Sequence, residues 1–148
     1  MIHSDNYDVD RFARAQDGAY QQALKEIKEG RKRSHWMWYI FPQVDGLGYS
    51  WFAQKYAIKN LEEAESYISH PKLKAHLNEI SEALLLISTN NVDEVMPMPD
   101  DLKLKSSMTL FALVDASNPV YKKVLDKFYN GEMCEFTKNT VEKWQASR

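Results

Sequence analysis

Three consecutive cations stand directly before a run of aromatic residues in residues 30–43, which read Gly-Arg-Lys-Arg-Ser-His-Trp-Met-Trp-Tyr-Ile-Phe-Pro-Gln. Arginine and lysine provide charge and hydrogen-bond donors for a phosphate or carboxylate, and an aromatic face can stack on a planar base. The segment therefore predicts part of a pocket for a nucleotide-like ligand. Its candidate binding residues are Arg31, Arg33, His35, Trp36, Trp38 and Gln43.

Each of these residues also has a purely structural interpretation. Large aromatic side chains such as Trp36 and Trp38 commonly pack in a core before they serve a ligand. The basic triplet can be a solvated turn, and a histidine among aromatic residues is commonly buried and bonded to backbone. The amide of Gln43 can bond backbone instead of a base edge. Both interpretations stay open on the sequence alone.

A second segment, residues 99–111, is crowded with polar groups and reads Pro-Asp-Asp-Leu-Lys-Leu-Lys-Ser-Ser-Met-Thr-Leu-Phe. Serine and threonine are poor residues for an exposed helix interior, so these hydroxyls are expected to bond something specific. Lys103 and Ser107 are four residues apart, so a helix would present both to one oxyanion, although an ordinary surface commonly shows the same spacing. The candidate residues here are Asp101, Lys103, Lys105, Ser106, Ser107 and Thr109.

Further chemical signals are few. The sequence has no glycine-rich phosphate loop, no nucleophile elbow and no histidine pair with metal-binding spacing. Its single cysteine, Cys134, stands between Glu132 and Glu135, which do not favour a reactive thiolate. We therefore expect no cofactor and no metal.

The elements that must position the two segments are predicted to be helices. Apolar residues recur at three- and four-residue steps, most clearly at Leu73, Leu77, Ile80, Leu84 and Ile87, and no period-two pattern of useful length occurs. Residues 36–41 fit either a buried strand or a helical turn. We expect an all-α, single compact domain of about six or seven helices. The expected helices are 9–29, 51–56, 60–69, one that carries the stripe and stops before Thr89, 101–116, 119–130, and a last one after Thr137 that carries Val141 and Trp144. The residues expected to cap or stop them are Asp8, Gly30, Ser50, Asn60, Asp100, Asn118 with Pro119, Gly131 and Thr137.

Composition limits the classes of partner. The 148 residues carry 19 Lys and Arg against 21 Asp and Glu, so the basic excess of a general nucleic-acid coating protein is missing. The longest apolar run has six residues, far below the ~20 that span a bilayer, and the first residues do not resemble a signal peptide. We expect one cytoplasmic domain over residues 1–148, with no membrane and no extended nucleic acid as partner.

Residues 30–43 and 100–111 resemble the two signature blocks of the bacterial "domain of unknown function 1810" family. Shorter matches support the resemblance at residues 12–16, 46–48, 56–58 and 67–71, and it extends over about residues 8–131. The chain departs from the pattern at Met96-Pro-Met-Pro99, where relatives more often carry a Phe-Gly pair. The resemblance implies a mainly α-helical fold and no established activity.

Three functions are compatible with these patterns. The leading hypothesis is binding, for sequestration or sensing and without catalysis, of a phosphorylated or nucleotide-like small molecule such as an ADP-ribose or cyclic-nucleotide derivative. The first alternative is a hydrolase of a nucleotide-derived glycosidic bond, with Asp101 and His35 as the candidates for its acid or base. The second is a protein-interaction module with residues 36–41 partly exposed. The leading hypothesis requires that the two segments converge on one ring-lined cavity. The sequence leaves the oligomeric state open.

Overall fold

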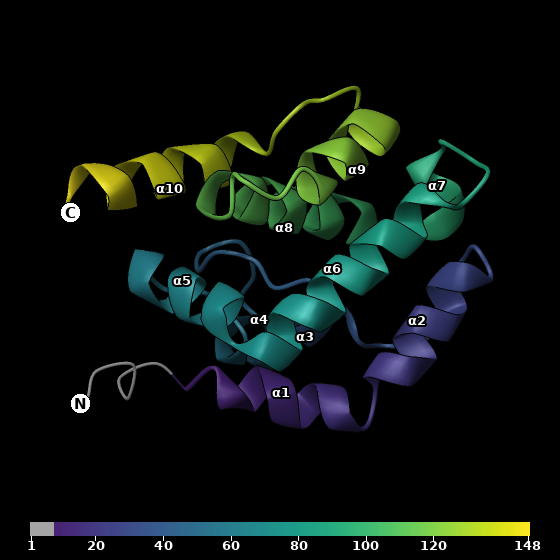
Figure 1. Cartoon of the computed structure of the whole chain (residues 1–148), viewed down its shortest axis with the longest axis horizontal. Coiled ribbons are helices and arrows are strands. Elements are labelled where there is room, and N and C mark those ends of the chain that lie inside the picture. Colours follow the sequence, from purple (N-terminus) through teal and green to yellow (C-terminus); the bar gives the residue numbers. More distant parts are fainter. Residues whose placement is uncertain (1–7) are drawn as a thin grey trace.

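The computed structural model describes residues 8–148, and the regular elements of this part of the chain are helices joined by loops (Figure 1). One isolated bridge between Val44 and Ile58 is the only extended pairing within those residues. The predicted all-α class is confirmed, but the predicted number of helices is wrong. The ten described helices are α1 (Asp10–Asp17), α2 (Tyr20–Lys28), α3 (Met37–Ile40), α4 (Trp51–Lys55), α5 (Leu61–Ser69), α6 (Pro71–Leu85), α7 (Val92–Val95), α8 (Asp100–Val114), α9 (Val120–Tyr129) and α10 (Glu135–Ala146).

The largest correction concerns the expected helix 9–29, which is two helices. α1 ends at Asp17, with Gly18 as its C-cap, and α2 begins after Ala19. The side chain of Gln16 is buried and donates to the carbonyl of Tyr39, which anchors the end of α1 near α3. Since α1 packs on α3 and α2 packs on α6, the break lets each half reach a different part of the core. Two single helical turns, α3 and α7, account for the rest of the difference in number.

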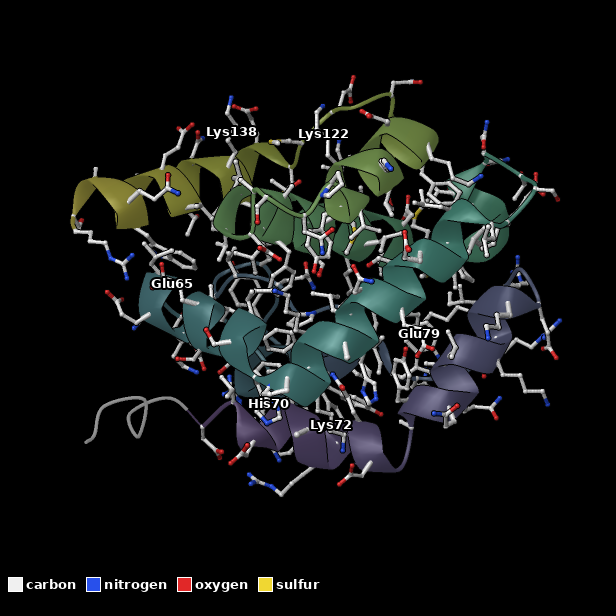
Figure 2. The ribbon with its side chains drawn as sticks, viewed as in Figure 1. Glu65, His70, Lys72, Glu79, Lys122 and Lys138 are labelled. Carbon is white, nitrogen blue, oxygen red and sulfur yellow. The ribbon has the colours of Figure 1, made fainter. Side chains whose placement is uncertain are left out.

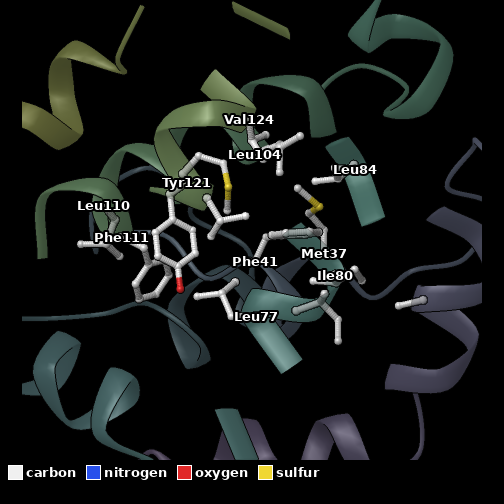
Figure 3. Close-up of a cluster of buried hydrophobic side chains, with 14 of the residues drawn as sticks. Met37, Phe41, Leu77, Ile80, Leu84, Leu104, Leu110, Phe111, Tyr121 and Val124 are labelled. Atoms are coloured by element: carbon white, nitrogen blue, oxygen red, sulfur yellow. The ribbon is translucent and has the colours of Figure 1, made fainter. Parts of the chain in front are cut away.

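The core is built around α6, which contacts α1, α2, α5 and α9, while α8 packs on α5, α9 and α10. The predicted stripe is confirmed at Leu73, Leu77, Ile80 and Leu84, which are all buried, whereas Ile87 lies beyond the end of α6 and is only partly buried. Figure 3 shows Leu77 and Ile80 facing Phe41 and Met37, with Tyr121 beside Phe111. Residues 36–41 therefore form a helical turn whose apolar side chains belong mainly to the core.

Three predicted terminal residues act as expected. Gly30 has a φ of 92°, and the amides of Gly30 and Arg31 bond back to the carbonyls of Ile27 and Glu26. This is the Schellman arrangement that a glycine permits after the end of a helix. Ser50 and Asn60 accept the amides of the third residues of α4 and α5.

Other expected caps are wrong. The residues at the N-cap positions of α1, α8 and α10 are Val9, Pro99 and Cys134, in place of Asp8, Asp100 and Thr137. Asp100 lies inside the first turn of α8, and the buried hydroxyl of Thr137 bonds across to α8. The N-cap of α9 is Pro119 itself, and the side chain of Asn118 accepts the amide of Val120. At the other end of α9, Asn130 adopts the left-handed conformation before Gly131.

Charged side chains lie around the periphery of this helical domain. Figure 2 shows Lys122 and Lys138 projecting outward from α9 and α10, and Glu65 at the edge of α5. Among the described residues, no helix has the length and apolar character needed to cross a membrane.

Candidate functional site

One buried carboxylate, Glu26 of α2, organises the loop between α2 and α3. Its Oε1 accepts the amides of Arg33 and Ser34 at 2.8 and 2.9 Å and the indole N–H of Trp36 at 2.9 Å. Its Oε2 accepts the Ser34 hydroxyl at 2.5 Å and the Gln22 amide at 2.9 Å. Because Glu26 is only 1% exposed, these bonds replace its contacts with water.

These hydrogen bonds keep Glu26 ionised. Burial by itself raises the pKa of this carboxyl group, but the donors from Ser34, Gln22 and the amides of Arg33 and Ser34 outweigh burial and lower the pKa to about 2. Sequence reasoning missed Glu26. The available signal was its place three residues after the buried Ala23 and directly before Ile27, on the apolar side of a helix.

The two segments singled out by the sequence meet at the start of α8. The Lys32 ammonium lies 2.7 Å from Asp100 Oδ2 and 5.2 Å from the centroid of the Trp36 ring. The Lys103 ammonium lies 3.6 Å from Asp100 Oδ1 and 5.4 Å from the centroid of the Trp38 ring. Asp100 thus pairs with both lysines, and each lysine also lies near one tryptophan. Lys32 is largely buried, whereas the Lys103 side chain is partly exposed.

Three other candidates of the first segment lie on the surface of the loop. Arg31 donates to the carbonyl of Glu94 at 3.1 Å, and Arg33 forms an exposed ion pair with Glu29 at 2.9 Å. His35 is exposed, and its carbonyl accepts the hydroxyl of Tyr39. Arg31 therefore contacts α7, and Arg33 contacts the residue that follows α2. Lys32, which lies between the two arginines in the sequence, pairs instead with Asp100 of α8.

The small hydroxyl residues of α8 hold α10 in place. Ser106 Oγ lies 2.8 Å from Thr137 Oγ1, and Thr109 accepts the amide of Cys134 at 2.9 Å while donating to the carbonyl of Lys105. Ser106 and Thr109 are both buried. Ser107 is also buried, and its hydroxyl has no hydrogen-bond partner among residues 8–148.

The remaining candidates of the second segment face the connection between α9 and α10. Lys105 lies 3.5 Å from Glu132. The carbonyl of Asp101 accepts the Tyr129 hydroxyl at 2.5 Å, and burial together with the nearby Asp101 charge raises the pKa of Tyr129. One carboxylate oxygen of Asp101 is buried without a partner in the described part of the chain. Trp38 and Lys103 therefore meet on a different side of α8.

A small hollow lies beside Trp38. Its volume is about 10 Å³, room for about one water molecule. Typical ligand pockets measure about 300–1,000 Å³, so this hollow cannot enclose a nucleotide. None of its lining residues comes from residues 99–111, so it is not the shared ring-lined cavity that the leading hypothesis requires. The close walls depend on two glycines, since a side chain at Gly46 would come within 3.1 Å of the Phe136 ring and one at Gly48 within 2.7 Å of Ala53. The hollow is lined by Trp38, Gln43, Val44, Gly46, Leu47, Gly48, Ala53 and Tyr56.

A row of three rings continues from Trp38 over α4, and we call Trp38, Phe52 and Trp51 the aromatic ledge. Trp38 stacks on Phe52 with ring centroids 4.8 Å apart, and Trp51 meets Phe52 edge-on at 4.9 Å. The Lys55 ammonium lies 4.8 Å from the centroid of Trp51, which is 65% exposed. Sequence reasoning missed Trp51 and Phe52, although two adjacent aromatic residues in a short helix cannot both face one core.

Comparison with known proteins gives relatives without a stated activity. A family model described as "Protein of unknown function (DUF1810)" matches residues 6–141. A crystal structure of the conserved hypothetical protein Rv1873 from Mycobacterium tuberculosis is similar, with 39% sequence identity and a TM-score of 0.90. The match covers 93% of this chain and 98% of that chain. No curated protein matches.

Proposed function

The chain belongs to the DUF1810 family of unknown function, and on that premise we propose that it binds a phosphorylated or nucleotide-like small molecule without transforming it. The ligand class is that of an ADP-ribose or cyclic-nucleotide derivative, met in the cytoplasm. The observation that supports this proposal is the proximity of the Lys103 ammonium to the Trp38 ring. Each residue belongs to one of the two segments that the sequence singled out.

The chemistry at this point suits a base with a phosphate attached. Trp38 is half-buried and already stacks on Phe52, so packing holds its position and a base would contact only the part of the ring that Phe52 leaves open. Lys103 supplies a partly exposed positive charge for a phosphate. Gln43 lines the hollow beside Trp38, and its carbonyl accepts the amide of Ile58, so its backbone is fixed. An amide side chain carried on this fixed backbone can reach toward the edge of a base.

The proposal uses a smaller set of residues than the sequence indicated. Trp38, Gln43 and Lys103 form the site, with Lys32 and Asp100 holding the two segments together behind it. A structural role accounts for three other candidates, because each contacts α10 or the segment that leads into it. These are Lys105, Ser106 and Thr109. Arg31, Arg33 and His35 stay as surface candidates for the outer parts of a longer ligand.

The two alternative functions have less support. A protein-interaction module at residues 36–41 needs an exposed aromatic face, but Trp36, Met37, Ile40 and Phe41 are all buried. A hydrolase needs its acid and base near one substrate. His35 is on the exposed loop, whereas Asp101 lies against α9, so no pocket shared by these two residues supports this function.

A binding assay tests the proposal. Tryptophan fluorescence and calorimetry would be followed during titration with ADP-ribose, NAD and cyclic AMP. We expect at least one of them to bind, and we expect Lys103→Gln and Gln43→Ala to weaken that binding about fivefold or more. Lys122→Gln is the matched control, because Lys122 is an exposed lysine on α9 whose near partner is Asp126. A folded wild-type protein that binds none of the three ligands would overturn the proposal.

A further inference from the structure

The aromatic ledge carries the same pair of residue types twice. At one end Lys103 lies near the Trp38 ring, and at the other end Lys55 lies near the Trp51 ring. Phe52 contacts both tryptophans, stacking on one and meeting the edge of the other. Two cation–ring pairs are therefore joined through one shared ring.

The outer half of the ledge is not explained by packing in the core. None of the five residues of α4 is buried, although two of them are large aromatics. Trp51 is 65% and Phe52 is 43% exposed, and Tyr49 just before the helix is 85% exposed. Trp51 and Phe52, which contact each other, therefore form an exposed aromatic pair that core packing does not account for.

Positive charge accompanies these rings at both ends. Within residues 8–148 no carboxylate forms an ion pair with Lys55. At the other end, Asp100 already pairs with Lys32 at 2.7 Å and lies farther from Lys103, at 3.6 Å. Both ammonium groups are thus placed to meet an anionic group of a ligand that lies along the ledge.

We propose that the ledge is a two-part site for a dinucleotide, that is, two planar bases joined by a linker that contains phosphate. One base stacks at Trp38 and the other at Trp51, and Lys103 and Lys55 meet the phosphates. Phe52 lies between the two stacking positions, so a single base occupies one position only. This inference rests on the proposed function and specifies the ligand class of the same site.

Comparing a one-base and a two-base ligand tests the inference. The probes are adenosine monophosphate and diadenosine diphosphate, titrated by calorimetry and tryptophan fluorescence. Because one stacked base contributes enough to change affinity about fivefold or more, we expect diadenosine diphosphate to bind the wild-type protein at least about tenfold more tightly. Trp51→Ala and Lys55→Gln are each expected to reduce that ratio to about twofold. Lys122→Gln should keep the wild-type ratio.

The possible results separate the two proposals. Equal affinities of the two probes for the wild-type protein would overturn the two-part site and leave the proposed function standing. A ratio that Trp51→Ala leaves at its wild-type value would also overturn the two-part site. Failure of every nucleotide to bind would overturn both proposals. Circular dichroism of each variant verifies folding, and the exposure of Trp51 and Lys55 predicts native spectra.

Discussion

The loop between α2 and α3 and the aromatic ledge are neighbours, since the ledge begins at Trp38 of α3, yet they place their functional groups in opposite ways. In the loop, Glu26, Lys32 and Trp36 are all less than 9% exposed. On the ledge, Trp51 and Phe52 are largely open to solvent and α4 has no buried residue. The loop holds the densest group of chemical side chains in the sequence, but most of them stabilise the fold. A segment that is dense in functional residues is therefore not necessarily one whose side chains are accessible to a ligand.

The largest effect should come from removing the carboxylate that organises the loop. Glu26→Ala leaves the amides of Arg33 and Ser34 and the indole of Trp36 without their acceptor. Since each buried donor without a partner costs about 1–3 kcal/mol, we expect the free energy of unfolding to fall by about 3–5 kcal/mol. Urea denaturation measures it. The control is Glu29→Ala, an exposed glutamate one turn away that pairs with Arg33, and its effect should stay below about 0.5 kcal/mol. A loss under about 1 kcal/mol for Glu26→Ala would contradict the organising role.

Acid should remove the same contribution without a mutation. The pKa of Glu26 is lowered from 4.5 to about 2, so its carboxylate stabilises the folded state fully above pH 4.5. That stabilisation, about 3 kcal/mol, is lost as the pH falls from 4.5 toward 2. Urea denaturation at several pH values would compare the wild type with Glu26→Gln. The variant should show a weaker decline over this interval, and identical declines would argue against a lowered pKa.

The ion pair between the two segments should matter somewhat less. Lys32→Ala removes a largely buried ammonium group 2.7 Å from Asp100, and Lys103 remains as the second partner of that carboxylate. We expect a loss of about 2 kcal/mol in unfolding free energy, below the cost of an entirely unpaired buried charge. The matched control is Lys122→Ala, with an exposed pair at 3.8 Å. Equal effects of the two substitutions would show that the segments need no ionic contact.

The smallest effect on stability is expected at the ledge. Trp51→Ala removes a large ring, but the ring is 65% exposed and belongs to a helix without a buried residue. We expect the unfolding free energy to change by less than about 0.5 kcal/mol, while ligand affinity falls as described above. Thermal unfolding measures this change. A loss above about 1.5 kcal/mol would mean that the ledge is part of the folding core, and the contrast with the loop would disappear.

Patterns in the sequence predicted those elements whose boundaries depend on residues close by in the sequence. The apolar stripe on α6 and the termini at Gly30, Ser50 and Asn60 belong to this group, because periodicity and capping act over three or four positions. The break between α1 and α2 had only a weak local signal, Gly18, because a single glycine is often tolerated inside a helix. The bond from Gln16 to Tyr39, a residue 23 positions later, adds a contact that local patterns do not show.

The candidate site shows the same division. The residue types near Trp38 and Lys103 indicated two segments that could bind a ligand, and these segments do meet at the start of α8. Their partners are distant in sequence, however, so the pairing of Lys32 with Asp100 could not be read locally. Nor could the exposure of Trp51, because it depends on which elements cover α4.

The attachment of the ledge has a consequence for the substitutions that the fold tolerates. Its outer residues on α4 touch the folded core through side chains such as Phe52 against Trp38, and they contribute no buried residue of their own. Substitutions within residues 49–55 are therefore expected to cost less folding stability than substitutions at Glu26 or Asp100. Under the proposed function, changes in this short helix alone would alter ligand affinity, with the same scaffold beneath it.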